Sequence, residues 1–138
     1  MGSMPSVANV VVIPRNGYAN RLQAWASAAI VARTWGAPLK VCWEEEAVCP
    51  ANASSLFRSA GERSTFISSV EVEDLLGGSH EGLPRYLTHD SDSGVVTLAG
   101  HDRGEQTFMS DLAQLAQESA KALTVVFIAG GRFRLPGE

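Results

Sequence analysis

Three apolar runs along the chain predict buried strands. Two of them, Ala8–Ile13 and Leu123–Ala129, are apolar at nearly every position, a pattern typical of parallel strands that are covered on both faces. The remaining run, Leu39–Trp43, lies between these two along the chain and begins shortly after Gly36, a residue type that commonly ends helices. Between Ile13 and Leu39 the apolar positions repeat every three to four residues, which predicts a helix over about Asn20–Trp35. A strand, a helix and a strand in this order form a βαβ unit, whose crossover is expected to be right-handed.

The predicted helix carries many alanines, which indicates a close approach to a sheet. We expect residues at helical spacing to share one face of it: Leu22, Trp25, Ala26, Ala29, Ile30 and Arg33. In the middle of the chain the pattern is weaker, and it predicts a helical turn at Ser54–Phe57, strands at Ser64–Ser69, Arg85–His89 and Val95–Ala99, and a helix at Val70–Leu76. Near the end the pattern is clearer and predicts an amphipathic helix over Glu105–Ala120. This alternation predicts the α/β class, as a Rossmann-like three-layer domain with a mostly parallel sheet.

Length and charge narrow the class of protein. The 138 residues suffice for one domain, and we expect residues 1–4 to be a vector remnant and residues 5–138 to form that single domain. The net charge of −4 disfavours a nucleic-acid partner, which normally requires a basic face. No apolar run approaches the roughly 20 residues of a membrane span, so we expect no membrane partner. The first residues show no signal-peptide pattern, which favours a cytoplasmic location.

The two cysteines, Cys42 and Cys49, lack the partners that a zinc site requires. They are either two reduced thiols, as in cytosolic proteins, or a disulfide that closes the loop after the second strand. We expect neither a metal nor another cofactor.

The loop after Ile13 is the first candidate site. In parallel sheets ligands gather at the carboxyl ends of strands, where the first N–H groups of the next helix are unpaired and the helix dipole is positive. Gly17 forms the turn, while Arg15 and Arg21 add positive charge, so this loop is suited to an anion or a sugar. The alternative is that Asn20 only caps the helix and that Arg21 points into solvent. With a single glycine, the loop matches neither a P-loop nor the dinucleotide fingerprint.

Three further residues are candidates for substrate chemistry. Glu44 begins an acidic triplet after the second strand, where its carboxylate could act as general base toward an acceptor hydroxyl, or could belong to a solvated charge run. Trp43 ends the same strand and could stack on a sugar ring, or pack in the core. His101, followed by Asp102, is either a substrate-binding or acid–base group or an exposed loop residue.

A longer stretch resembles a known family. The segment Gly17-Tyr18-Ala19-Asn20-Arg21-Leu22, followed by Ser27-Ala28, Val41, Trp43 and Leu56-Phe57, is similar to the N-terminal half of bacterial fucosyltransferase-like glycosyltransferases of the GT-B type. Their opening is G-x-x-N-R-L-x-x-x-x-S-A, and a strand ending in V-x-W follows. The resemblance is strongest over Ile13–Phe57. It departs at Ala19, where many relatives keep glycine, and this chain contains no H-x-R-x-x-D motif of the kind that binds the nucleotide-sugar in the second domain of those enzymes.

The resemblance implies an acceptor-side domain that lines a cleft, inactive alone and completed by a second domain beyond the Pro136-Gly137 break. The implied substrates are a nucleotide-sugar, such as GDP-fucose, and a glycan or small-molecule acceptor. We expect Arg21 and Glu44 to be catalytic; the expected substrate-binding residues are Arg15, Gly17, Asn20, Trp43 and His101. On this basis Arg21→Ala should weaken binding with little loss of stability. The alternative is a stand-alone, non-catalytic interaction module, and in either case an exposed interdomain face could support a homo-oligomer.

Overall fold

The computed structural model describes residues 7–15, 17–45, 49–61, 63–76, 88–90, 95–99 and 122–129, and all that follows concerns these residues. The predicted vector remnant, the predicted helix Glu105–Ala120, the candidate His101 and the break at Pro136-Gly137 lie outside them.

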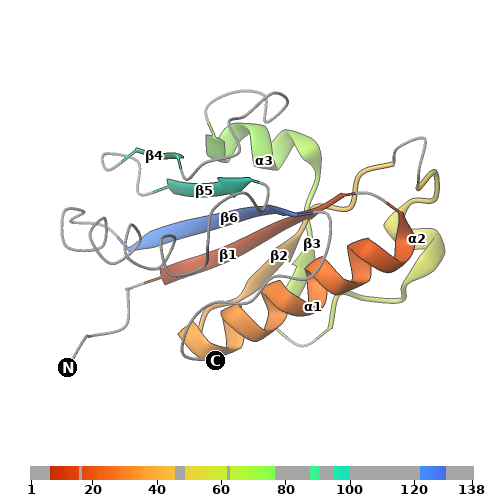
Figure 1. Cartoon of the computed structure of the whole chain (residues 1–138), viewed down its shortest axis with the longest axis horizontal. Coiled ribbons are helices and arrows are strands. Elements are labelled where there is room, and N and C mark those ends of the chain that lie inside the picture. Colours follow the sequence, from red (N-terminus) through yellow and green to blue (C-terminus); the bar gives the residue numbers. More distant parts are fainter. Residues whose placement is uncertain are drawn as a thin grey trace.

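Six strands form one sheet in the order β3-β2-β1-β6-β5-β4 (Figure 1). Their bounds are β1 Val7–Pro14, β2 Leu39–Val41, β3 Ser64–Phe66, β4 Thr88–Asp90, β5 Val95–Ala99 and β6 Leu123–Ala129. Every neighbouring pair is parallel except β4 and β5, which are antiparallel. The mostly parallel α/β sheet predicted from the sequence is therefore confirmed.

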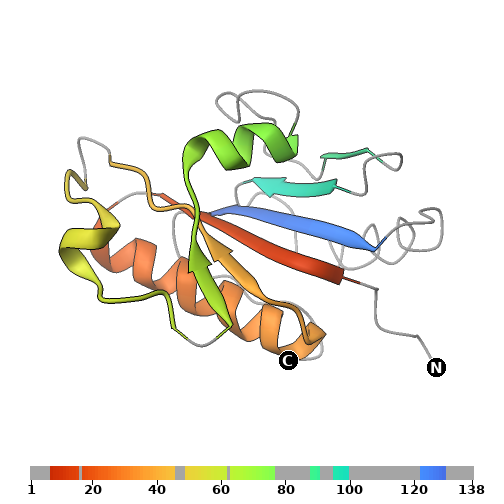
Figure 2. The same cartoon turned by 180° about the vertical axis from the view of Figure 1, so that it is seen from behind.

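The described residues form three helices beside the sheet: α1 Tyr18–Trp35, α2 Ala53–Leu56 and α3 Ser69–Leu76. Helix α1 packs on one face, and α3 packs on the opposite face, as the two opposed views show (Figures 1 and 2). The three layers of the predicted Rossmann-like domain are thus present.

Strand β1 is the centre of the core because it is covered on both faces. Its alternating side chains point to opposite sides, so that Val10 and Val12 pack toward α1, whereas Val11 and Ile13 pack toward α3. All four are fully buried. In register, Val12 lies between Val41 of β2 and Phe127 of β6. The uninterrupted apolar run in the sequence is explained by these two covered faces.

Helix α1 begins at Tyr18, two residues earlier than predicted, and ends as expected at Gly36. Gly36 adopts a left-handed conformation with φ of 65°, and its N–H points to the carbonyls of Ala32 and Arg33. The buried face, however, is not the predicted one. It consists of Arg21, Ala24, Ser27, Ala28, Val31 and Ala32, one position away from the predicted set, and Ile30 is 53% exposed. Because the inner face is made of small side chains and one arginine, apolar spacing does not mark it.

In the part of the chain that the structure describes, no helix combines the length and the apolar character needed to cross a bilayer.

Candidate functional site

The carboxyl edge of the sheet gathers six of the seven candidate residues. Strands β1 and β6 end side by side, where the Arg15 N–H donates to the Ala129 carbonyl over 2.8 Å. Strand β2 ends beside them, since the Cys42 N–H donates to the Val12 carbonyl. The chain enters α1 from the end of β1, whereas Trp43 and Glu44 come after Cys42, the first residue beyond β2. This is the edge at which parallel α/β sheets bind ligands.

Glu44 is held on both of its carboxylate oxygens. Arg15 Nη1 lies 3.1 Å from Glu44 Oε1, and the Ser69 hydroxyl, from the first residue of α3, donates to Oε2 over 2.8 Å. The two charged side chains keep about a quarter and a fifth of their surface exposed, so the pair is open to solvent on one side. The next residue, Glu45, is exposed. A solvated charge run therefore describes Glu45 but not Glu44, which is fixed at the rim.

A buried thiol lies beneath this ion pair. Burial, and next the negative charge of Glu44, raises the pKa of Cys42 to about 11, although the Ser69 hydroxyl and Arg15 act in the opposite direction. The thiol is therefore protonated at neutral pH, which makes it a poor nucleophile. Cys42 and Cys49 are both buried, and no disulfide joins them in the structure. Within the described residues, no group of three or more His, Cys, Asp or Glu side chains is placed to hold a metal ion.

Arg21 lies under the edge and is fully buried. Its guanidinium donates from Nη1 to the Glu44 carbonyl, and its central carbon is 5.1 Å from the centre of the Trp43 ring. The alternative in which Arg21 points into solvent is therefore wrong. Arg21 therefore contacts the backbone at Glu44 and the ring of Trp43, and its catalytic role stays a prediction. The expectation that Arg21→Ala costs little stability loses its basis.

The mouth of α1 is formed by Gly17, which occupies the N-cap position in an extended conformation. No side chain among the described residues caps this end, and its first turn contains no acidic residue. The alternative in which Asn20 caps the helix is thus wrong, and Asn20 is exposed. The first-turn N–H groups and the positive end of the helix dipole point to the same edge as Arg15.

Five aromatic rings form a cluster beside this mouth, which we call the aromatic cluster. Its members come from α1, the segments after β2 and α2, and β3: Tyr18, Trp25, Trp43, Phe57 and Phe66. Trp43 is only 8% exposed, and its indole N–H donates to the Ala51 carbonyl over 3.1 Å. The exposed member is Tyr18, at 46%, whose ring is parallel to that of Phe57 at 6.3 Å. Tyr18, rather than the predicted Trp43, offers an open ring surface.

An open hollow of about 720 Å³ adjoins the aromatic cluster. It follows the chain from Asn52 to Arg58, along α2, and is also lined by Phe66 of β3. The hollow was not predicted from the sequence because this segment shows only a weak pattern; Leu56 and Phe57, which the family resemblance includes, were the available signal.

Comparison of the chain with protein-family models, with curated proteins and with solved structures finds no significant match.

Proposed function

We propose that this chain is the acceptor-side domain of a fucosyltransferase-like glycosyltransferase of the GT-B type. The proposed reaction transfers a sugar from a nucleotide-sugar, such as GDP-fucose, to a hydroxyl of a glycan or small-molecule acceptor. One observation carries the proposal: Glu44 is held at the carboxyl edge by Arg15 and Ser69, beside the mouth of α1, where the G-x-x-N-R-L segment begins.

Glu44 is the proposed general base. Its carboxylate is partly exposed and is kept in one orientation by two partners, which suits a group that must accept a proton from an acceptor hydroxyl. The charge that develops on the departing nucleotide would lie near Arg15 and the N-terminal dipole of α1. Arg21 is a positioning residue in this scheme, because it is fully buried and donates to the backbone carbonyl of Glu44. The contacts to the nucleotide are assigned to a second domain, since the H-x-R-x-x-D motif is missing from this sequence.

The acceptor is assigned to the aromatic cluster and the adjoining hollow. Tyr18 is half exposed, and the hollow combines the ring of Phe57 with the polar side chains of Asn52 and Arg58. Small-molecule sites commonly combine apolar walls with a few polar groups in this way. Asn20, in the first turn of α1, is exposed, and its amide adds a hydrogen-bonding group at the same helix end as Tyr18.

The test is a transfer assay with GDP-fucose on the complete gene product, comparing Glu44→Gln with Glu45→Gln. The first change removes the proton acceptor but keeps the shape of the side chain, and we expect kcat to fall by about 10²- to 10⁴-fold. The matched control removes a neighbouring exposed carboxylate and should retain full activity. Equal activity of both variants, or no transfer from any nucleotide-sugar by the unchanged protein, would overturn the proposal.

A non-catalytic interaction module is the second candidate, and the exposed apolar side chains Tyr18 and Leu56 near the hollow favour it. This module would bind a partner or a second copy of the chain through that region. Sedimentation of the unchanged chain against Leu56→Ser tests it: self-association that the substitution weakens supports the module, and a monomer at all concentrations contradicts the homo-oligomer. A cytoplasmic location is proposed for either candidate, supported by the two free, buried thiols.

A further inference from the structure

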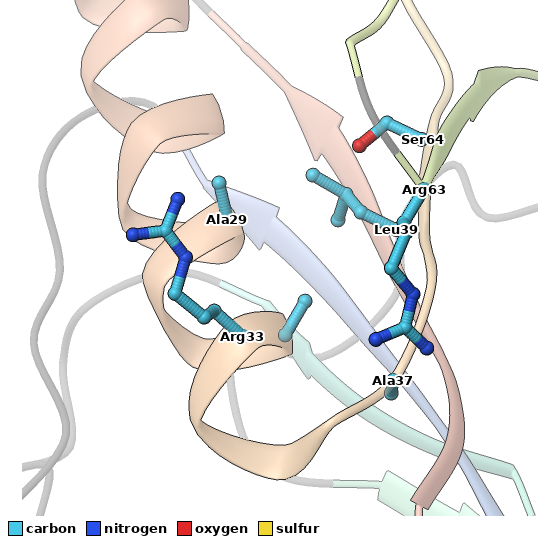
Figure 3. A pocket seen from close by; sticks show the side chains of 7 residues that line it. Ala29, Arg33, Ala37, Leu39, Arg63 and Ser64 are labelled. Atoms are coloured by element: carbon cyan, nitrogen blue, oxygen red, sulfur yellow. The ribbon is translucent and has the colours of Figure 1, made fainter.

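A second cavity lies at the opposite, amino edge of the sheet, between the last turn of α1 and the beginnings of β2 and β3 (Figure 3). Its volume is about 200 Å³. The residues that argue for a ligand are two arginines that line the cavity, Arg33 from α1 and Arg63 from the residue before β3. Apolar side chains complete the lining, among them Ala29, Ala37 and Leu39.

The backbone holds the two walls in place. The Leu39 N–H donates to the Arg63 carbonyl over 3.0 Å, and the guanidinium of Arg63 donates from Nη2 to the Gly36 carbonyl over 3.2 Å. Arg63 has a φ of 56°, a left-handed conformation that residues other than glycine seldom adopt. This conformation starts β3 while the Arg63 side chain reaches back to the end of α1.

The described residues that line this cavity carry positive charge only. Among the described residues that line it, none is acidic, although the chain as a whole carries a net charge of −4. Capping of the C-terminal end of α1 accounts for one hydrogen bond of Arg63, and a guanidinium has five donors. Arg33 is exposed, and no hydrogen bond or ion pair joins its guanidinium to another of the described residues. Two guanidiniums that line one small cavity repel each other, and an anion bound between them replaces this repulsion with attraction.

We propose that this cavity binds a small phosphomonoester. Guanidinium groups match phosphate oxygens in pairs, and a phosphate dianion balances both arginines, whereas a single carboxylate would balance only one. The volume is below the roughly 300 Å³ at which sites for drug-sized ligands begin, so the organic part has only a few carbons. Ala29, Ala37 and Leu39 provide the apolar wall for those carbons. The site is at the other edge of the sheet from Glu44, so it does not depend on the proposed glycosyl transfer.

The test is to titrate the chain with ethyl phosphate, inorganic phosphate and acetate, at constant ionic strength and pH 7.5. Calorimetry measures the binding, and amide NMR locates it. We expect saturable binding of ethyl phosphate, weaker binding of phosphate, and the weakest of acetate, with the shifted amides near Arg33 and Arg63. Arg33→Gln and Arg63→Gln should each weaken ethyl phosphate by about tenfold or more. The matched control, Arg58→Gln, removes an exposed arginine elsewhere and should leave the affinity unchanged.

A second variant tests the cavity without removing charge. Ala29→Leu places a larger side chain against the cavity and keeps both guanidiniums, so it should abolish binding of ethyl phosphate while the melting temperature stays close to that of the unchanged chain. Binding that does not saturate, that falls equally in Arg58→Gln, that survives Ala29→Leu, or that favours acetate over phosphate would overturn the proposal.

Discussion

Arg21 in the first turn of α1 and Arg33 in its last turn lie at opposite edges of the same sheet, in opposite surroundings. Arg21 is fully buried, donates to the Glu44 carbonyl and lies against the Trp43 ring. Arg33 is exposed and shares its cavity with Arg63, without an acidic residue among the described residues around them. A buried arginine with matched partners supports structure, whereas two arginines that share a cavity without an acid point to a ligand.

At the carboxyl edge the charged groups are likewise paired with partners from the protein. Arg15 balances Glu44, and Ser69 satisfies the second carboxylate oxygen. Glu44, the proposed general base, is therefore pre-oriented by the protein itself, whereas the two arginines at the amino edge can pair with an incoming anion.

The largest effect expected from this comparison is that of Arg21→Ala. It removes a buried side chain and leaves the Glu44 carbonyl and the Trp43 ring without their partner, so we expect a loss of about 3 kcal/mol in the free energy of unfolding. Arg33→Ala, on the same helix, should change it by no more than about 0.5 kcal/mol. Urea unfolding of both variants measures the difference; similar losses in the two would remove the distinction between the helix ends.

The next largest effect is a dependence of the free energy of unfolding on pH, which comes from the Cys42 thiol. Because the pKa of this thiol is raised from 9.0 in the unfolded chain to about 11 by burial and by Glu44, the folded state binds more protons between these values. The stability that this supplies is complete below pH 9 and is lost as the pH rises toward 11, by about 2 to 3 kcal/mol. Unfolding of the unchanged chain and of Cys42→Ala from pH 8 to 11 tests it. The two curves should converge as the pH rises, and parallel curves would show that the thiol is not responsible.

A smaller effect is expected from the partly exposed ion pair. In a double-mutant cycle of Arg15→Gln and Glu44→Gln, we expect a coupling free energy of about 0.5 to 1 kcal/mol, which added salt should reduce. Thermal unfolding at low and high ionic strength measures it. A coupling of zero at low salt would mean that Arg15 does not hold the Glu44 carboxylate in solution.

The smallest effect on stability belongs to Arg63→Asn. Asparagine tolerates the left-handed conformation better than most residues, which offsets the lost hydrogen bond to Gly36, so the free energy of unfolding should change by less than about 0.5 kcal/mol. Ethyl phosphate binding should nevertheless be lost. A large loss of stability would assign Arg63 to the fold rather than to a ligand.

Much of the sheet could be predicted, because the doubly covered strands are apolar throughout. The predicted Leu123–Ala129 strand matches β6, and Gly36 marked the end of α1 correctly. The buried face of α1 could not be predicted in the same way, since apolar spacing treats Arg21 as a surface residue. Cation–π contact and a carbonyl partner, both tertiary, are what allow its burial.

The same limit applies to the two candidate sites: the sequence predicts which residues lie at an edge of the sheet, but not which side chains meet there. The position of Gly17, Asn20 and Glu44 at the carboxyl edge follows from the order of strands and helices, so local patterns suffice to predict it. The contact between Glu44 and Ser69, and the cavity between Arg33 and Arg63, join residues from separate elements. No spacing in the sequence encodes those pairings, which depend on how α1, α3 and the strands pack.

The most direct test of the proposed sugar-transfer edge is amide NMR of the chain titrated with GDP-fucose and with a panel of oligosaccharides. We expect saturable shifts at Gly17, Tyr18, Asn20, Glu44 and Ser69 for the acceptor sugar, and their loss in Glu44→Gln but not in Glu45→Gln. Shifts confined to Arg33 and Arg63 would support the anion cavity and contradict a sugar site at the carboxyl edge. Absence of any shift at that edge, with every sugar tested, would contradict it as well.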